Sequence, residues 1–220
     1  MRITPFWITL LAVNAHATLI LSTDFTGRTV NGKTAENIPW TAGGVQDPGD
    51  LTWVVETGTT TNTDLFDTGA AKNHFAPDLN IHNEGFWSVT IPLVLTTPRI
   101  SLENVVIDWR DFSNTGVFQG SGRDSQYTVS VTGSISGLLD TVDTGVLGST
   151  FGRETLPFTT PLELTDGENY DVLIFASGSG PGNNTGLNAV ELNGSVIPEP
   201  SGLGLAFLGI TLLVRARKSR

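Results

Sequence analysis

Residues 87–95 read Trp-Ser-Val-Thr-Ile-Pro-Leu-Val-Leu, and this stretch decides the fold class. Large apolar side chains stand at every second position, with Ser88 and Thr90 between them. Successive side chains of a β-strand point to opposite faces of a sheet, so the pattern is typical of a strand with one buried face. Residues 127–132 alternate in the same way. The sequence therefore predicts half-buried strands that share a core.

Further runs of strand-forming residues lie on both sides of this stretch. We expect strands at 19–25, 51–56, 100–112, 159–164, 169–176 and 186–193. Residues 170–175 carry apolar side chains on both faces, which predicts a central strand covered on each side. Turn-forming clusters such as Asp47-Pro48-Gly49-Asp50 and Thr165-Asp166-Gly167-Glu168 separate the runs. We expect no amphipathic helix between residues 18 and 197.

The length and the composition narrow the fold. Of the 220 residues, 18–197 are enough for one all-β domain with its own core. The chain has no cysteine, so burial and hydrogen bonds must stabilise the domain without disulfides. We predict an all-β, two-sheet antiparallel sandwich. A jelly roll is favoured over an immunoglobulin topology because of the length and the missing Cys-Trp-Cys core.

The charge is unevenly distributed along the chain. All 22 acidic residues lie between Asp24 and Glu199, whereas only seven of the 12 basic residues lie in that span. A field of this sign repels phosphate backbones and anionic lipids, which argues against nucleic acid as a partner. An acidic surface suits a soluble exported protein, and it also suits a surface that binds calcium.

Residues 1–17 have the composition of a secretory signal peptide. Arg2 supplies a positive charge, and residues 6–13 form an apolar stretch too short to span a bilayer comfortably. Ala15-His16-Ala17 then provides the small-x-small site that signal peptidase accepts. We expect cleavage between Ala17 and Thr18; the alternative is a buried N-terminal helix.

Residues 198–220 contain three parts in a fixed order. They are Pro198-Glu199-Pro200, an uncharged apolar run at 202–214, and a basic end at 215–220 with Arg215, Arg217, Lys218 and Arg220. The two prolines forbid helix and hold their segment extended. As a helix the apolar run would rise about 20 Å against a hydrocarbon core of about 30 Å. It predicts a short transmembrane anchor with the basic cluster on the cytoplasmic side.

Together these three parts resemble the sorting signal of PEP-CTERM proteins. The resemblance covers residues 198–220, and Ile197 stands where valine is common. It implies recognition by an exosortase, a membrane-embedded cysteine transpeptidase of bacteria that make exopolysaccharide, which would cut near Pro198-Glu199-Pro200. The body would be exported, anchored in the inner membrane before processing, and then attached to the cell surface or released. An ordinary short tail anchor is the alternative.

The body carries a second, looser resemblance. Residues 100–110, 169–175 and 186–192, the last just ahead of the motif, resemble the jelly-roll bodies that often precede such tails. This similarity concerns strands and carries no chemistry. We expect a non-catalytic surface or extracellular-matrix protein displayed beside exopolysaccharide. The alternatives are a carbohydrate-binding module that acts on exopolysaccharide and a secreted glycan hydrolase.

Two groups of residues are candidate metal ligands. Jelly rolls often hold their first and last strands together with a calcium ion bound by oxygen atoms. The residues suited to a structural calcium site of this kind are Asp24, Asn188 and Glu191. His74 and His82 could form a second site with Asp78 or Glu84, but their spacing fits no helix face and no known ligand pair.

The tryptophans fall into two classes, and catalytic motifs are missing. Trp53, Trp87 and Trp109 alternate with aliphatic neighbours and are expected in the core. Trp40 follows Pro39 in a polar, glycine-rich segment and is the candidate for stacking on a glycan. The sequence has no Gly-x-Ser-x-Gly, no His-Glu-x-x-His and no phosphate-binding loop, so we expect no enzyme. Glycosidase carboxylates depend on spatial separation, which a sequence does not give.

Overall fold

The computed structural model describes residues 18–57, 64–78, 85–113, 115–119, 124–178 and 183–198. The predicted signal peptide, the membrane segment 202–214 and the basic end 215–220 lie outside these ranges, as do Glu199 and Pro200 of the motif. Over the described ranges, no helix has the length and apolarity that crossing a membrane requires. Export and sorting therefore stay predictions from the sequence.

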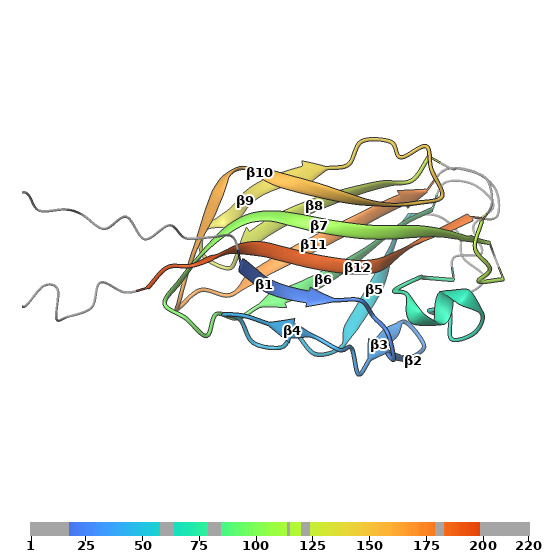
Figure 1. The fold of residues 1–220 in the computed structure, drawn as a ribbon, viewed down its shortest axis with the longest axis horizontal. Coiled ribbons are helices and arrows are strands. Elements are labelled where there is room, and N and C mark those ends of the chain that lie inside the picture. Colours follow the sequence, from blue (N-terminus) through green and yellow to red (C-terminus); the bar gives the residue numbers. More distant parts are fainter. Residues whose placement is uncertain are drawn as a thin grey trace, which may run out of the picture.

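One sheet has five antiparallel strands. They are β1 (Thr18–Thr23), β4 (Thr41–Ala42), β7 (Arg99–Ser113), β10 (Phe151–Thr165) and β12 (Asn183–Val196). Their order across the sheet is β10-β7-β12-β1-β4. The two long strands β7 and β12 pair along almost their whole length and form the middle of this sheet (Figure 1).

The second sheet has seven antiparallel strands. They are β2 (Thr29–Asn31), β3 (Thr34–Glu36), β5 (Leu51–Thr57), β6 (Gly85–Leu93), β8 (Gln126–Gly133), β9 (Gly137–Asp143) and β11 (Tyr170–Gly178). Their order is β2-β3-β5-β6-β11-β8-β9. In the described ranges the sole helical element is a single 3₁₀ turn, η1 (Ala70–Asn73). The predicted all-β, two-sheet antiparallel sandwich is confirmed.

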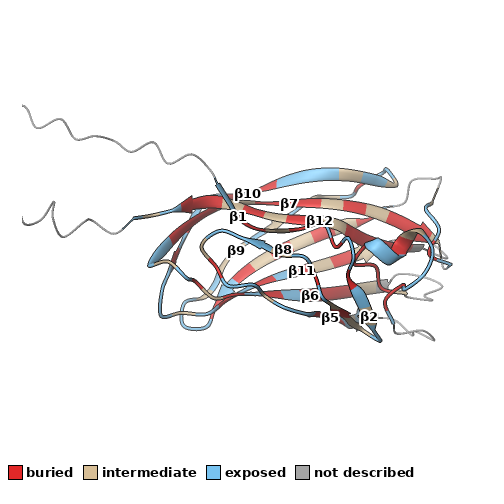
Figure 2. Cartoon of the chain, turned by 60° about the horizontal axis from the view of Figure 1, so that its bottom comes forward, coloured by how far each residue is buried: buried red, intermediate tan, exposed pale blue. Residues whose placement is uncertain are grey.

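The core lies between the two sheets, and alternation along the strands creates it. Trp53, Trp87 and Trp109 are each 1% exposed, which confirms their predicted place in the core. Figure 2 shows buried positions alternating with more exposed ones along β11, whereas β12 is buried or half-buried along most of its length. Trp109 of β7 packs against Tyr127 of β8, with ring centroids 6.5 Å apart. The Tyr127 hydroxyl donates to the Gly186 carbonyl oxygen at 3.2 Å, so its polar end is satisfied inside the sandwich.

The central strand β11 differs from its prediction. It lies between β6 and β8, as expected, but it is covered on one face only. Leu173 is 37% exposed, and Phe175 is half-buried through stacking on Phe86, with ring centroids 5.5 Å apart. The prediction of cover on both faces was wrong because the five-stranded sheet packs on one face and neighbouring side chains alone shield the other.

Strand β10 is much longer than predicted. It begins at Phe151, whereas the sequence pattern placed its start at residue 159. Pro157 and Pro161 interrupt the pattern, and the pairing with β7 is irregular between Pro157 and Leu162. Proline is tolerated in β10 because this strand forms the edge of its sheet, where amide groups need no partner.

Strands β1 and β12 meet at one end of the sandwich. Thr18 pairs with Gly194, and the Thr18 hydroxyl donates a hydrogen bond to the Gly194 carbonyl oxygen at 3.1 Å. Strand β1 is described from Thr18, the first described residue, and β12 ends at Val196, just before the Pro-Glu-Pro motif. We call the end of the sandwich where Thr18 lies beside Gly194 the tether end. The turn η1 lies at the opposite end (Figure 1).

Candidate functional site

A polar groove lies at the end of the sandwich that carries η1. It consists of two adjoining pockets of about 300 and 370 Å³, both lined by Val30 and Asp67. The first pocket is also lined by Gly32, Asp64, Leu65, Phe66, Thr68, Asp78 and Thr115. The second is also lined by Gly27, Arg28, Thr29, Lys72 and Asn73. Most of these residues belong to β2, to the turn before it, and to segment 64–78.

Backbone hydrogen bonds hold segment 64–78 against the sheets. Leu65 N–H donates to the Gly32 carbonyl oxygen at 2.9 Å, and within the segment Asp78 N–H donates to the Asp64 carbonyl oxygen at 2.7 Å, which closes its two ends on each other. Phe75 and Leu187 of β12 exchange two hydrogen bonds of 2.9 and 3.0 Å. The segment therefore continues the pairing of β12 beyond the point where β1 ends, and it gives the groove a fixed wall.

Arg28 ties the same segment to the turn before β2. Its Nε donates to the His74 carbonyl oxygen at 2.7 Å, and its Nη2 donates to the Phe66 carbonyl oxygen at 2.8 Å. A third, longer bond of 3.4 Å runs from Nη2 to the Ala71 carbonyl oxygen. The residue is only 6% exposed, and burial lowers the pKa of Arg28 to about 10. It therefore keeps its charge at neutral pH.

A small hydrophobic cluster supports the groove from the outer face of the five-stranded sheet. Its buried members are Phe66, Ala71, Ala76 and Phe112. The His74 ring packs edge-on against Phe112 at 5.0 Å, and burial lowers the pKa of His74. Gly116 has φ +71°, and a Cβ there would lie 3.0 Å from the Phe66 ring, so this close approach favours glycine.

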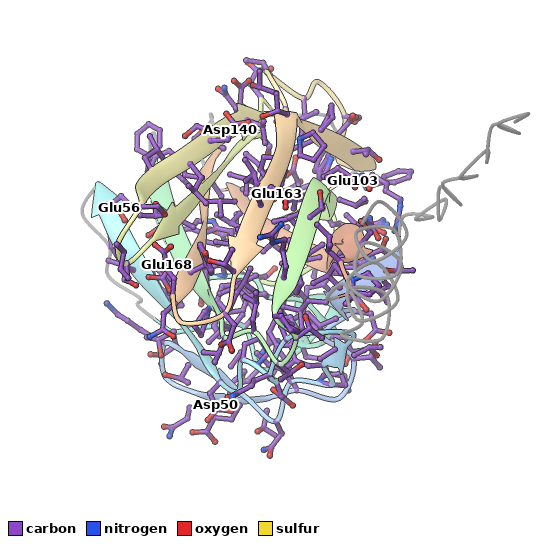
Figure 3. All side chains as sticks on the ribbon, turned by 90° about the vertical axis from the view of Figure 1, so that its left-hand side faces the viewer. Asp50, Glu56, Glu103, Asp140, Glu163 and Glu168 are labelled. Atoms are coloured by element: carbon purple, nitrogen blue, oxygen red, sulfur yellow. The ribbon has the colours of Figure 1, made fainter. Side chains whose placement is uncertain are left out.

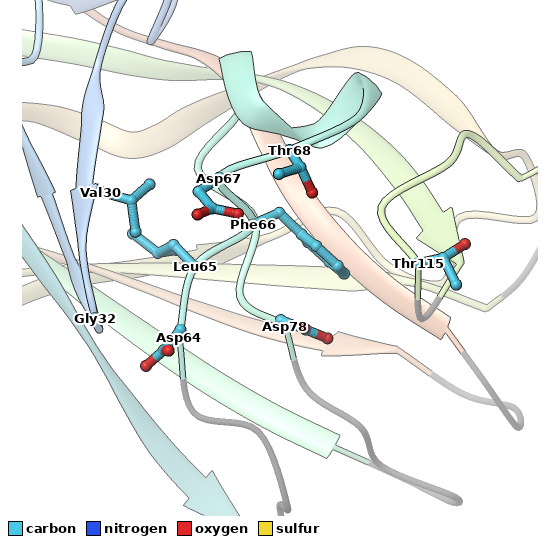
Figure 4. Close-up of a pocket in the computed structure, with 9 residues that line it drawn as sticks. All are labelled: Val30, Gly32, Asp64, Leu65, Phe66, Asp67, Thr68, Asp78 and Thr115. Atoms are coloured by element: carbon cyan, nitrogen blue, oxygen red, sulfur yellow. The ribbon is translucent and has the colours of Figure 1, made fainter.

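The groove presents hydrogen-bonding groups of both kinds. Figure 4 shows Asp64 and Asp67 on the side of Gly32 and Val30, Thr115 on the opposite side, and the Phe66 ring between them. Carboxylates accept hydrogen bonds, whereas ammonium and guanidinium groups donate them. Asp64 and Asp67 are exposed, as is Lys72 in the second pocket. The arrangement suits a polar ligand rich in hydroxyl groups, because hydroxyls both donate and accept.

The predicted calcium ligands are brought together only in part. Asp24 and Glu191 line one pocket of about 330 Å³ between β1 and β12, but Asn188 is not among its lining residues. Asp24 Oδ1 accepts a hydrogen bond from Thr26 N–H at 3.0 Å, and Glu191 forms an ion pair with Arg153 at 2.6 Å. Among the residues that the structure describes, no three His, Asp or Glu side chains are grouped so that they could hold a metal ion.

Trp40 is half-buried and engaged with its neighbours. Its ring meets Phe25 edge-on, with centroids 6.5 Å apart, and its Nε1 donates to the Gly49 carbonyl oxygen at 2.8 Å. The aromatic rings with more exposed surface are Phe151, 59% exposed, and Phe118, 40% exposed. They flank the guanidinium of Arg110 at 4.9 and 3.7 Å from the ring centroids.

The described residues include only part of the second candidate metal site, and the labelled carboxylates come from several strands and turns. His82 and Glu84 lie outside the described residues, and His74 is buried in the cluster beside Phe112. Figure 3, which looks along the sandwich from the tether end, shows the labelled carboxylates on several sides of the molecule, with Asp50 and Asp140 at opposite edges of the view. Hydrogen bonds lower the pKa of Asp140 and bring that of Glu168 to about 2, so neither suits a general acid.

Sequence reasoning missed most of the groove. The sequence suggests Asp78 only as a metal ligand beside His74, and the other charged residues of the groove carry no local signal. They are Arg28, Asp64, Asp67 and Lys72. Arg28 is separated from segment 64–78 by the strands β2 to β5, and no spacing rule connects the two parts of the chain.

The chain matches no protein-family model and no curated protein. Among solved structures it is similar to the carbohydrate-binding module TmCBM61 in complex with β-1,4-galactotriose, at 9% identity and a TM-score of 0.35, over 76% of this chain and 88% of that one. A second carbohydrate-binding module of the β-sandwich superfamily has 10% identity, a TM-score of 0.34 and coverage of 82% and 86%. A putative glycoside hydrolase from Bacteroides thetaiotaomicron has 7% identity, a TM-score of 0.31 and coverage of 87% and 99%. Likenesses this slight transfer neither a ligand nor an activity to the chain.

Proposed function

We propose that this chain is an exported surface protein whose β-sandwich is displayed outside the cell after an exosortase processes its tail. The observation that carries the proposal is the sequence of the tail, in which Pro198-Glu199-Pro200, an apolar run and a basic end follow one another. The same chain begins with a signal-peptide pattern. The body is non-catalytic in this proposal.

The position of the strand ends supports the same function. Because Thr18 pairs with Gly194, both junctions with the predicted export segments lie at the tether end. Removing residues on either side would leave all twelve described strands intact, since β1 begins at Thr18 and β12 ends at Val196. A body attached through its C-terminal side would expose the groove, at the opposite end, to the surroundings of the cell.

The proposal is tested by fractionating the native host and a strain that lacks its exosortase. We expect the body at the surface or in the medium of the wild type, and retained in the membrane fraction of the deletion strain. Protein that is found in the cytosol of both strains would contradict export. Unchanged surface display in the deletion strain would contradict sorting by an exosortase.

We propose carbohydrate binding as a second function, which the groove favours. The groove combines exposed carboxylates, an amide and cationic groups on a wall fixed by backbone hydrogen bonds. Pockets of several hundred Å³ are the usual size of small-ligand sites. Taken together, the two pockets of the groove are lined mainly by polar groups. An exopolysaccharide next to the cell is a ligand of matching chemistry.

Glycan-array binding of the purified protein tests this function. We expect binding that Asp67→Ala abolishes, because Asp67 lines both pockets. Trp40→Ala tests the alternative site that the sequence suggests. If Trp40→Ala loses binding and Asp67→Ala keeps it, the glycan binds at Trp40 and not in the groove. Asp50→Ala removes an exposed carboxylate from outside the groove and serves as the control. A blank array would remove carbohydrate binding from consideration.

We further propose that the sandwich is a jelly roll. Eight of its strands follow the order β1-β12-β7-β10 in one sheet and β6-β11-β8-β9 in the other. The chain crosses between the sheets so that the first and last strands become neighbours. Strands β2 to β5 then extend the edges of this framework, with β4 beside β1 and β5 beside β6.

A further inference from the structure

Two cations meet at the second pocket of the groove in a chain that is otherwise strongly acidic. The chain has a formal net charge of −10, yet Arg28 and Lys72 both line this pocket. Asp67 is the acidic residue among its lining side chains. The pocket therefore carries a local excess of positive charge against the sign of the whole molecule.

The guanidinium of Arg28 is buried, and one of its nitrogen donors has no hydrogen-bond partner among the described residues. Within the described ranges Nη1 of Arg28 has no hydrogen-bond partner, although Nε and Nη2 are occupied by carbonyl oxygens. The charge of Asp67 acts on Arg28 from a distance, but both ion pairs in the described part of the chain involve Arg153. A buried cation with an unmatched donor is costly, so an anion that approaches it would recover part of that cost.

Lys72 provides a second, accessible cation at the same place. It lies in η1, is exposed, and its side chain forms no hydrogen bond or ion pair within the part of the chain that the structure describes. Its ammonium group is therefore available to a ligand. Thr29 and Asn73 line the same pocket and can bond neutral hydroxyl groups.

We propose that the groove binds an acidic polysaccharide, with a sugar carboxylate beside Arg28 and Lys72 and sugar hydroxyls at Asp67 and Asn73. This inference rests on the proposed carbohydrate binding and specifies its ligand class. A uronic acid combines the two required chemistries, because each sugar carries one carboxylate and several hydroxyls. Asp64 and Asp67 repel a duplex nucleic acid, which carries one charge per about 1.7 Å of its axis, more strongly than a chain with one charge per sugar.

The acidic body does not prevent this binding. Charges separated by more than about 8 Å are largely screened at physiological salt, so the local pair of cations outweighs distant carboxylates. The preference for an acidic glycan should therefore persist at physiological salt and fade in concentrated salt, where the local contacts are screened as well.

Isothermal titration calorimetry of the intact protein with oligogalacturonate tests the proposal. The comparison ligand is the same oligosaccharide with its carboxyl groups reduced to alcohols. We expect the acidic form to bind at least about tenfold more tightly. Lys72→Ala should lower the affinity for the acidic form about three- to tenfold and leave the reduced form unchanged. Lys72 is exposed, so this variant should fold normally.

Lys33→Ala is the matched control, because it removes one lysine of the same domain that does not line either pocket. An equal loss with Lys33→Ala, or equal affinity for the acidic and reduced oligosaccharides, would overturn the proposal. If neutral glycans bind on the array and oligogalacturonate does not, the acidic ligand class is wrong while carbohydrate binding stands. If no glycan binds at all, both fail.

Discussion

The two ends of the sandwich are built by different interactions. At the tether end, backbone pairing joins β1 to β12, with Thr18 opposite Gly194. At the groove end, side-chain hydrogen bonds contribute much of the attachment, since Arg28 donates to three carbonyl oxygens of segment 64–78. The tether end is a continuous part of the sheet, whereas the groove end joins the sheet through one short bridge, Phe75 to Leu187, and through the side chain of Arg28.

This difference has consequences for stability and for binding. A backbone ladder is cooperative with the whole sandwich, so a defect there should destabilise the whole domain. Segment 64–78 is held by a few backbone bonds, to Gly32 and Leu187, and by the side chain of Arg28, so it can open locally while the sheets stay folded. Adaptable binding surfaces are commonly carried by segments of this second kind.

The largest expected effect is at the tether end. A Cβ added at Gly194 would collide with the Ser101 carbonyl oxygen of β7, so Gly194→Ala must displace backbone in the middle of the five-stranded sheet. We expect a loss of about 3 kcal/mol in the free energy of unfolding, measured by urea denaturation. Gly148→Ala is the control, because a Cβ added at Gly148 would meet no atom within 4 Å. Equal stability of the two variants would contradict the close approach of Gly194 to the Ser101 carbonyl oxygen.

The next effect separates the two ends. Arg28→Met removes the side-chain donor from three carbonyl oxygens, of which, among the described residues, only that of Ala71 keeps a bond, from His74 N–H, and we expect it to cost about 2 kcal/mol. Amide hydrogen exchange should accelerate in segment 64–78 and stay slow in β7 and β12. Arg99→Met, at an exposed arginine, should change neither. Uniform acceleration over both sheets would show that segment 64–78 does not open independently of them.

A smaller effect concerns pH. Glu168 accepts hydrogen bonds from Ile135 N–H, Ser136 N–H and the Ser136 hydroxyl, and these bonds lower its pKa from 4.5 to about 2. A depressed folded-state pKa contributes stability above about pH 4.5 that is lost as the pH falls toward 2. Glu168→Gln should therefore flatten the fall of Tm over this window. An unchanged slope in the variant would mean that these bonds do not form in solution.

The smallest effect concerns calcium. A calcium ion between β1 and β12 would have to compete with Arg153 for Glu191, so the proposed ion should raise Tm by a few degrees at most. The increase should disappear in Asp24→Asn and on adding a chelator. No change in Tm with calcium would remove the proposed structural ion.

The sequence predicts the sheets better than the groove, and the reason is physical. Alternation places Trp87 and Val89 on the opposite side from Ser88, and burial of one face forces that register, so β6 was found correctly. Strand β9 was missed because Leu138 is exposed and the two residues that pack on the core, Leu139 and Val142, do not follow a period of two. The sequence around Arg28 does not indicate its hydrogen bond to the His74 carbonyl oxygen. Every residue has a carbonyl oxygen, so no residue type marks the acceptor in advance.

The central claim is that the folded body crosses the inner membrane and is processed at both ends. Mass spectrometry of the protein recovered from its native host tests it most directly. We predict a mature chain that begins at Thr18 and ends near Pro198. A product that retains Met1 and Arg220 would contradict the account.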